Sequence, residues 1–83
     1  MPKHSHTFVE EYNGLVGYGF NRETDEHTLT YYLQKFSDDK HMATILAKMS
    51  DSDMEELFNL LGRLLKKYLT EEEYHGQFLK DTD

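Results

Sequence analysis

Residues 52–69 read SDMEELFNLLGRLLKKYL, and this stretch decides the predicted fold because it has one period, one start signal and one charge gradient. Placed on a helix at about 100° per residue, its large apolar side chains share one face and its polar side chains fill the other. The pattern therefore predicts an amphipathic helix over 52–69. The apolar face consists of Met54, Leu57, Phe58, Leu61, Leu64, Leu65 and Tyr68, with Gly62 and Leu69 near its edge.

The same stretch carries signals for both ends of a helix. Ser52 stands three residues before Glu55, which is the spacing of a capping box, where the two side chains accept hydrogen bonds from otherwise unpaired backbone amides. Acidic residues open the helix, and Arg63, Lys66 and Lys67 close it, an order that the helix dipole favours. We therefore expect one well-defined helix at the centre of the fold.

The length and composition of the chain limit the folds open to it. Its 83 residues predict one small domain over 1–83, and a domain of this size buries only about 60% of the surface that its unfolded chain exposes. The chain has no cysteine, so stability is expected from tight helix packing or from self-association instead of disulfides. The lack of cysteine also suits a reducing compartment, and we expect a cytoplasmic protein.

The net charge separates the possible classes of partner. Sixteen acidic residues against nine basic ones give a formal charge of −7, which repels both nucleic acid and anionic membrane surfaces. No apolar run approaches the roughly 20 residues that are needed to span a bilayer. The expected partner is therefore another protein, and neither nucleic acid nor a membrane.

Residues 1–22 form an arm rich in tyrosine and glycine whose structure the pattern leaves open. Two segments with strand propensity flank Asn13-Gly14, a dipeptide typical of a two-residue β-hairpin turn. Gly14, Gly17 and Gly19 weaken both a strand and a helix in this arm. We expect either a β-hairpin or an irregular arm that is held against the helices by its aromatic rings. These rings are Phe8, Tyr12, Tyr18 and Phe20.

Capping signals predict further helices on either side of the central one. Thr24 or Asp25 can cap a helix that runs to about Phe36, although the β preference of residues 28–32 leaves a strand as the alternative. The remaining predicted helices are 38–49, capped by Ser37, and 71–80, opened by a capping box of Thr70 and Glu73.

Together these patterns predict a mainly α fold, a small bundle of three to four short helices around the central helix. The Tyr- and Gly-rich arm takes residues 1–22, the helical region takes 24–80, and 81–83 are expected to fray. An α+β fold is the alternative, because the arm and residues 28–32 have strand propensity.

The histidines are the residues most able to hold a metal ion. Glu72 and His75 have the Glu-x-x-His spacing of di-iron bundles, but such a site needs two copies of the motif and two more carboxylates. A second chain or His41 could supply some of these ligands. The run of glutamates over 71–73 is explained more simply as a solvated helix start. We predict no metal and no cofactor, and a metal-binding bundle that uses Glu72, His75 and His41 is an alternative.

The sequence carries no catalytic constellation, because its serines lack a nucleophile context and its glycines match no phosphate-binding fingerprint. We therefore predict that the protein is not an enzyme. A DNA-binding regulator is a further alternative, with 38–49 as its reading helix. Asp38 and Asp39 stand where such a helix meets the bases, so charge opposes this alternative.

The width of the apolar face in 52–69 predicts an interaction surface. Leu60 lies about 110° from the centre of that face, beyond what neighbouring helices of one domain usually cover. A two-fold contact needs only one self-complementary patch, so a homodimer is expected. We predict a non-enzymatic, cytoplasmic interaction or regulatory module that self-associates. Its expected interaction residues are Leu57, Leu60, Leu64 and Leu69, with Tyr12 and Tyr18 from the arm.

Overall fold

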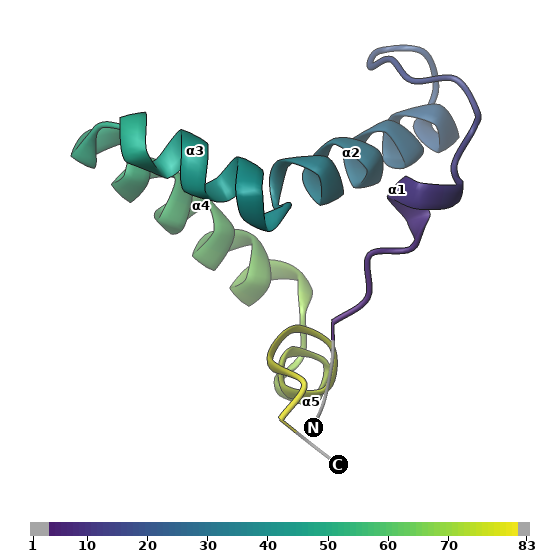
Figure 1. The fold of residues 1–83 in the computed structure, drawn as a ribbon. Coiled ribbons are helices and arrows are strands. Elements are labelled where there is room, and N and C mark those ends of the chain that lie inside the picture. The colour runs from purple at the N-terminus through teal and green to yellow at the C-terminus, as the bar shows by residue number, and fades with distance from the viewer. Residues whose placement is uncertain (1–3, 82–83) are drawn as a thin grey trace. The chain divides into compact units, whose positions relative to one another are not determined.

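The computed structural model describes residues 4–81, and helices account for 72% of them (Figure 1). No strand occurs anywhere in this range. The predicted mainly α fold is thus confirmed, and the α+β alternative is wrong. The chain divides into two compact units, an N-terminal unit, Ser5–Lys48, and a C-terminal unit that begins at Met49.

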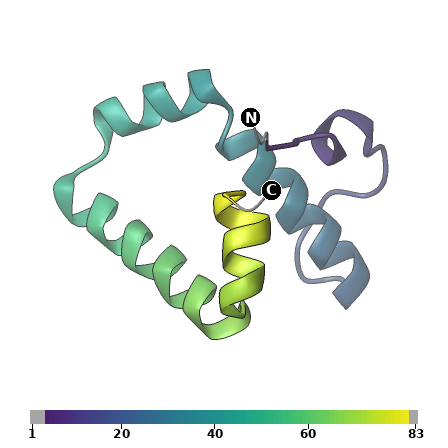
Figure 2. The same ribbon diagram turned by 90° about the horizontal axis from the view of Figure 1, so that it is seen from below.

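Three helices make up the N-terminal unit. They are α1 (Phe8–Glu11), α2 (Arg22–Phe36) and α3 (Asp39–Lys48). The short helix α1 lies beside α2 (Figures 1 and 2). The backbone amide of Val9 donates to Oε1 of Gln34 over 3.0 Å, which ties the two helices together. The long helix α2 is therefore the element against which the arm is arranged.

The N-terminus of α2 lies earlier than the capping signals predicted. Asn21 is the cap, because its Oδ1 accepts a hydrogen bond of 2.9 Å from the Thr24 amide. The predicted caps, Thr24 and Asp25, lie inside the first turn of the helix. The strand alternative for residues 28–32 is wrong as well, since these residues are helical.

The β-hairpin expected around Asn13-Gly14 is not formed. The backbone that would pair with a second strand makes its hydrogen bonds with side chains. The amide and carbonyl groups of Gly17 both bond to the Thr28 hydroxyl of α2, and the Tyr12 hydroxyl donates to the Leu15 carbonyl. Since side chains satisfy these polar groups, the arm needs no strand pairing and is irregular after α1.

Asp38 caps the N-terminus of α3, one residue after the predicted cap, Ser37. The carboxylate of Asp38 accepts a hydrogen bond of 3.3 Å from the His41 amide. The ring of His41 turns back to α2, where its Nδ1 lies 2.7 Å from the carbonyl oxygen of Phe36. A carbonyl only accepts, so Nδ1 carries the hydrogen and satisfies a group that the end of α2 leaves unpaired.

The C-terminal unit contains the predicted central helix, α4 (Asp51–Tyr68). Its cap is Ser50, whose hydroxyl accepts a hydrogen bond of 3.1 Å from the Asp53 amide. Ser52, the predicted cap, lies within the first turn. The helix predicted over 52–69 is therefore present, and each of its ends lies one residue earlier than expected.

A second helical segment follows α4 and contains α5 (Glu71–Glu73) and the π-helix η1 (Tyr74–Leu79). The predicted capping box is confirmed, because the Thr70 hydroxyl accepts from the Glu73 amide and the Glu73 carboxylate accepts from the Thr70 amide. Lys80 ends the segment in the left-handed region, with φ of 56°. Of the end expected to fray, residues 82 and 83 lie outside the described range.

The apolar side chains of the described residues are only partly shielded from solvent. No apolar side chain among residues 4–81 is buried, and Thr28 is the buried residue of this range, with 5% of its surface exposed. Burial of apolar surface is the main favourable contribution to folding and to most protein association. The helices thus keep apolar surface that a partner can cover.

Candidate functional site

The apolar face of α4 is exposed along most of its length. Phe58 exposes 76% of its surface, more than any other large apolar side chain in the described range, and Tyr68 exposes 67%. Leu60, at the margin of the face, exposes 40%. The exposed members of this apolar face are Met54, Phe58, Leu60, Leu61, Leu64 and Tyr68. One helix therefore presents a continuous apolar strip that is long enough to contact another helix.

The four leucines predicted as interaction residues do not all lie in the same surroundings. Leu57 and Leu60 line a shallow hollow of about 580 Å³, whose charged margin includes Asp53 and Arg63. Leu64 is exposed on the same side of α4. Leu69 is half-buried and lines a separate hollow of about 390 Å³ next to the segment that follows α4. Three of the four leucines thus share one surface, and Leu69 stands apart from it.

Charged residues flank the apolar face of α4 on both edges. At about 100° per residue, one edge has Asp53 in its first half and Lys67 in its second. The other edge has Glu55 in its first half and Lys66 in its second. All four are exposed, and none forms an ion pair within residues 4–81. Glu56 and Arg63 lie farther round the helix, toward its polar face.

Gly62 lies close to the apolar face, on the edge that also carries Glu55 and Lys66. A β-carbon added at this position would meet no atom within 4 Å among the described residues. A glycine in the interior of a helix costs up to about 1 kcal/mol relative to alanine. The space next to its backbone is open to a side chain of a partner.

A second cluster of functional groups lies on the N-terminal unit, where α1 meets α2. The ring of Tyr12 stacks on Phe8 with centroids 4.9 Å apart and contacts His27 and Tyr31 at 5.3 and 5.9 Å. The ammonium group of Lys35 lies 4.9 Å from the centre of the Tyr31 ring. Tyr12, predicted as an interaction residue, therefore joins the arm to α2 through its ring.

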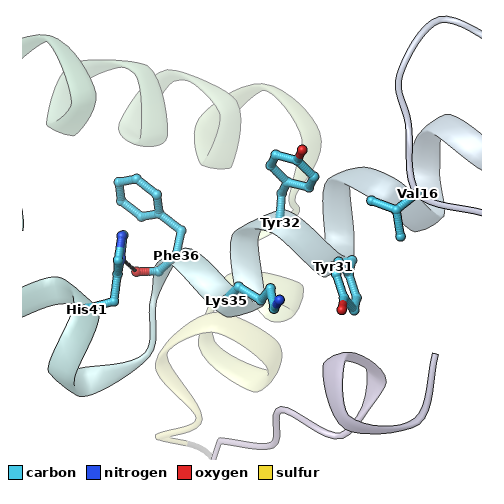
Figure 3. Close-up of a pocket in the computed structure, with 6 residues that line it drawn as sticks. All are labelled: Val16, Tyr31, Tyr32, Lys35, Phe36 and His41. Atoms are coloured by element: carbon cyan, nitrogen blue, oxygen red, sulfur yellow. Dashed lines mark hydrogen bonds between the residues drawn. The ribbon is translucent and has the colours of Figure 1, made fainter. Parts of the chain in front are cut away.

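An open hollow of about 450 Å³ lies beside this cluster (Figure 3). Figure 3 shows Tyr32 and Phe36 projecting from one side of α2, while Tyr31 and Lys35 project from another. Val16 approaches from the arm, and His41 of α3 closes the end near Phe36. Aromatic walls with one cation suit a flat or anionic group, but the hollow is wide open to solvent, so it holds no enclosed ligand site.

Tyr18, the other predicted interaction residue of the arm, contacts no ring in the described range and exposes 74% of its surface. It lies in the segment that Asp25 holds, because the Asp25 carboxylate accepts hydrogen bonds from the amides of Gly19 and Phe20. The prediction that the aromatic rings of the arm lie on the helices thus holds for Tyr12 and fails for Tyr18.

The candidate metal ligands do not form a cluster. Nδ1 of His75 lies 3.1 Å from both carboxylate oxygens of Asp81, and Nε2 lies 3.7 Å from Glu71. The two carboxylates are thus on opposite sides of the ring, and Glu72 forms neither a hydrogen bond nor an ion pair with it. His41 belongs to the other unit and bonds to Phe36. Within residues 4–81 no group of three or more potential ligands can hold a metal ion.

Two features of the N-terminal unit were missed in the sequence. The four-residue spacing of His27, Tyr31 and Lys35 places all three on one face of α2, and this shared face could have been predicted from the helical period. The role of Thr28, which bonds to the Gly17 backbone, had no such signal. Its partner lies in an irregular segment whose path the spacing of residues does not predict.

None of the helices described for residues 4–81 is both long enough and apolar enough to span a bilayer. Comparison with protein-family models, with curated proteins and with solved structures finds no match to this chain.

Proposed function

We propose that the protein is a non-enzymatic interaction module that forms a homodimer through the apolar face of α4. The observation that carries the proposal is the exposure of this face, in which Phe58 and Tyr68 are more than half exposed. Proteins that act as monomers rarely expose contiguous apolar patches of more than a few hundred Å², and larger patches mark interaction sites. Aromatic side chains at the centre of such a patch supply much of the binding energy.

A second copy of the chain is the partner that this surface suits. The shallow hollow beside Leu57 and Leu60 has an apolar floor and a margin that carries both signs of charge, namely Asp53, Glu56 and Arg63. A surface with both signs can complement itself across a two-fold axis. A partner of strongly basic or strongly acidic character would meet like charge on part of the same margin.

The proposal includes a cytoplasmic location and a regulatory or assembly role. The absence of cysteine from all 83 residues supports a reducing compartment. The formal charge of −7 supports a protein partner, because it repels nucleic acid.

The test compares the mass of the wild type in solution with the masses of two matched variants. Leu60→Lys places a charge in the apolar face, and Ser52→Lys places the same charge on the opposite, polar face of α4. Size exclusion with light scattering should give a dimer for the wild type and for Ser52→Lys. The Leu60→Lys variant should be a monomer that keeps its helical circular dichroism.

Two results would contradict the proposal. The first is a wild type that remains a monomer at high micromolar concentration, which would mean that the apolar face is covered within one chain. The second is equal weakening of the dimer by Leu60→Lys and Ser52→Lys, since the effect of an added charge would then not depend on the face of α4 that carries it.

A further inference from the structure

We propose that the two copies of α4 in the homodimer run antiparallel, with the midpoint of the contact between Leu60 and Leu61. This inference rests on the proposed homodimer and adds the direction and register of its helices. The argument comes from the positions of the exposed charges along α4. Two-fold symmetry places each edge of an antiparallel helix against the same edge of its copy, whereas parallel helices bring opposite edges together.

In the antiparallel register opposite charges come together on both edges of α4. On one edge Asp53 lies within one residue, about 1.5 Å along the axis, of the level of Lys67 of the second copy. These side chains are exposed and have no ion-pair partner within residues 4–81. The same register therefore brings these two opposite charges together without any change in the helix.

The charges on the second edge favour the same register independently. Glu55 lies opposite Lys66 of the second copy when Leu60 and Leu61 are at the midpoint. The antiparallel direction also opposes the two helix dipoles, so the positive N-terminus of each α4 lies near the negative C-terminus of the other.

A parallel pair would bring like charges together at both ends. Glu55 of one copy would lie near Asp53 of the other, because opposite edges meet in the parallel arrangement. At the other end Lys66 would lie near Lys67 of the second copy. Like charges in register destabilise helix pairs and select against the wrong orientation. The charge pattern thus discriminates between the two directions.

The apolar side chains fit the antiparallel register as well. Leu57 lies opposite Leu64 of the second copy, so the contact has leucines on both sides of its midpoint. Phe58, the most exposed of the large apolar side chains described, lies over the turn that contains Gly62 of the second copy. The open space beside Gly62 can accept this ring, because no atom of its own described chain occupies it.

Disulfide cross-linking tests the direction, and the absence of native cysteine makes each introduced thiol unique. Leu61→Cys lies at the centre of the apolar face, next to the midpoint, and should join to its own copy under mild oxidation. Met54→Cys alone and Tyr68→Cys alone should not join, since each thiol would be about 20 Å from its copy along the axis, at about 1.5 Å per residue. A mixture of these two variants should give the heterodimer, which a tag on one of them reveals by mass.

The outcomes separate this inference from the proposed function. A dimer in which Met54→Cys joins to itself as readily as Leu61→Cys is parallel, which overturns the inference and leaves the homodimer standing. A dimer without cross-links at any of these positions overturns both the register and the use of α4. A wild-type monomer overturns the homodimer and the inference together.

Charge reversal gives a second test whose sign differs between the two directions. Glu55→Lys should weaken an antiparallel dimer, raising its dissociation constant roughly threefold to thirtyfold, because two exposed pairs become repulsive. Adding Lys66→Glu to the same chain should restore affinity. In a parallel dimer Glu55→Lys would strengthen association instead, and that result would overturn the inference. Ser52→Lys, on the polar face of the same turn, is the control and should change affinity little.

Discussion

The hydroxyl of Thr28 and the backbone of Gly17 exchange two hydrogen bonds, each 3.0 Å long. The hydroxyl accepts from the Gly17 amide and donates to the Gly17 carbonyl, so both polar groups of one residue in the arm are satisfied by one side chain of α2. With 5% of its surface exposed, Thr28 is the best shielded of the described residues. This contact holds the middle of the arm against α2.

Replacing Thr28 by valine should therefore release the arm. Valine has the same shape but neither donor nor acceptor, so the Gly17 amide and carbonyl lose their partner, at a cost of about 1–3 kcal/mol. We expect faster hydrogen exchange of the Gly17 amide and a lower melting temperature. Thr28→Ser keeps the hydroxyl and should keep most of the protection of this amide. Equal exchange in the valine variant and the wild type would contradict the contact.

The same contact explains why the hairpin prediction failed. Asn13-Gly14 has the composition of a hairpin turn, and residues on both sides of it can form strands. Two isolated strands are marginal in water, and an alternative partner for their backbone groups decides the outcome. That partner is a threonine eleven residues after Gly17, which no local pattern identifies. Long-range bonds from a side chain to an irregular backbone are beyond analysis of sequence periodicity.

Loss of the Asn21 side chain should destabilise the start of α2. Its Oδ1 accepts the hydrogen bond of the Thr24 amide, and an alanine would leave that donor to water, at a cost of about 1 kcal/mol. For a chain of this size the melting temperature should fall by about 4–8 °C. Asn21→Asp should melt close to the wild type, because aspartate accepts the same bond. Equal melting of the alanine and aspartate variants would show that the cap contributes nothing.

The ends of α4 show what the sequence predicts well and what it leaves open. The apolar period fixed the helix and its exposed face in advance, since Phe58, Leu61 and Leu65 recur at helical spacing. Two serines, Ser50 and Ser52, each stand three residues before an acidic residue, so the capping pattern fits both. The earlier serine caps the helix, which adds Asp51 to the first turn, where the helix dipole favours a negative charge. Whether the exposed face is the functional one stays a prediction.

The capping box of Thr70 and Glu73 should show coupling between its two side chains. Each accepts a hydrogen bond from the backbone amide of the other, at 3.1 Å and 2.9 Å. Because the two bonds close one loop, loss of either side chain should loosen the other. Thr70→Ala and Glu73→Ala should each cost about 0.5–2 kcal/mol, and the double variant should cost less than the two single losses together.

The measurement for this box is a double-mutant cycle by chemical denaturation with circular dichroism. Glu72→Ala is the matched control, since Glu72 belongs to the same turn of α5 but takes no part in the box. Strict additivity of Thr70→Ala and Glu73→Ala would show that the two hydrogen bonds act independently.

Two glycines of the arm should respond in opposite ways to the same added methyl group. A β-carbon at Gly14 would lie 2.6 Å from Oη and 2.8 Å from Cζ of Tyr12. The Tyr12 ring cannot move away freely, because it stacks on Phe8 and its hydroxyl bonds to the Leu15 carbonyl. Gly14→Ala should therefore lower the free energy of unfolding by about 1–3 kcal/mol, as overpacking does.

A β-carbon at Gly17 would also be too close to a ring, 2.7 Å from Cε2 of Phe20. That ring is exposed, so it can turn aside at little cost. Gly17→Ala keeps the backbone bonds to Thr28 and restricts the unfolded chain, which should leave stability unchanged or raise it by up to about 1 kcal/mol. Parallel thermal denaturation of the two variants checks the contrast. If Gly17→Ala loses as much stability as Gly14→Ala, the Phe20 ring is held in its position, and this segment of the arm is packed more firmly than its exposure indicates.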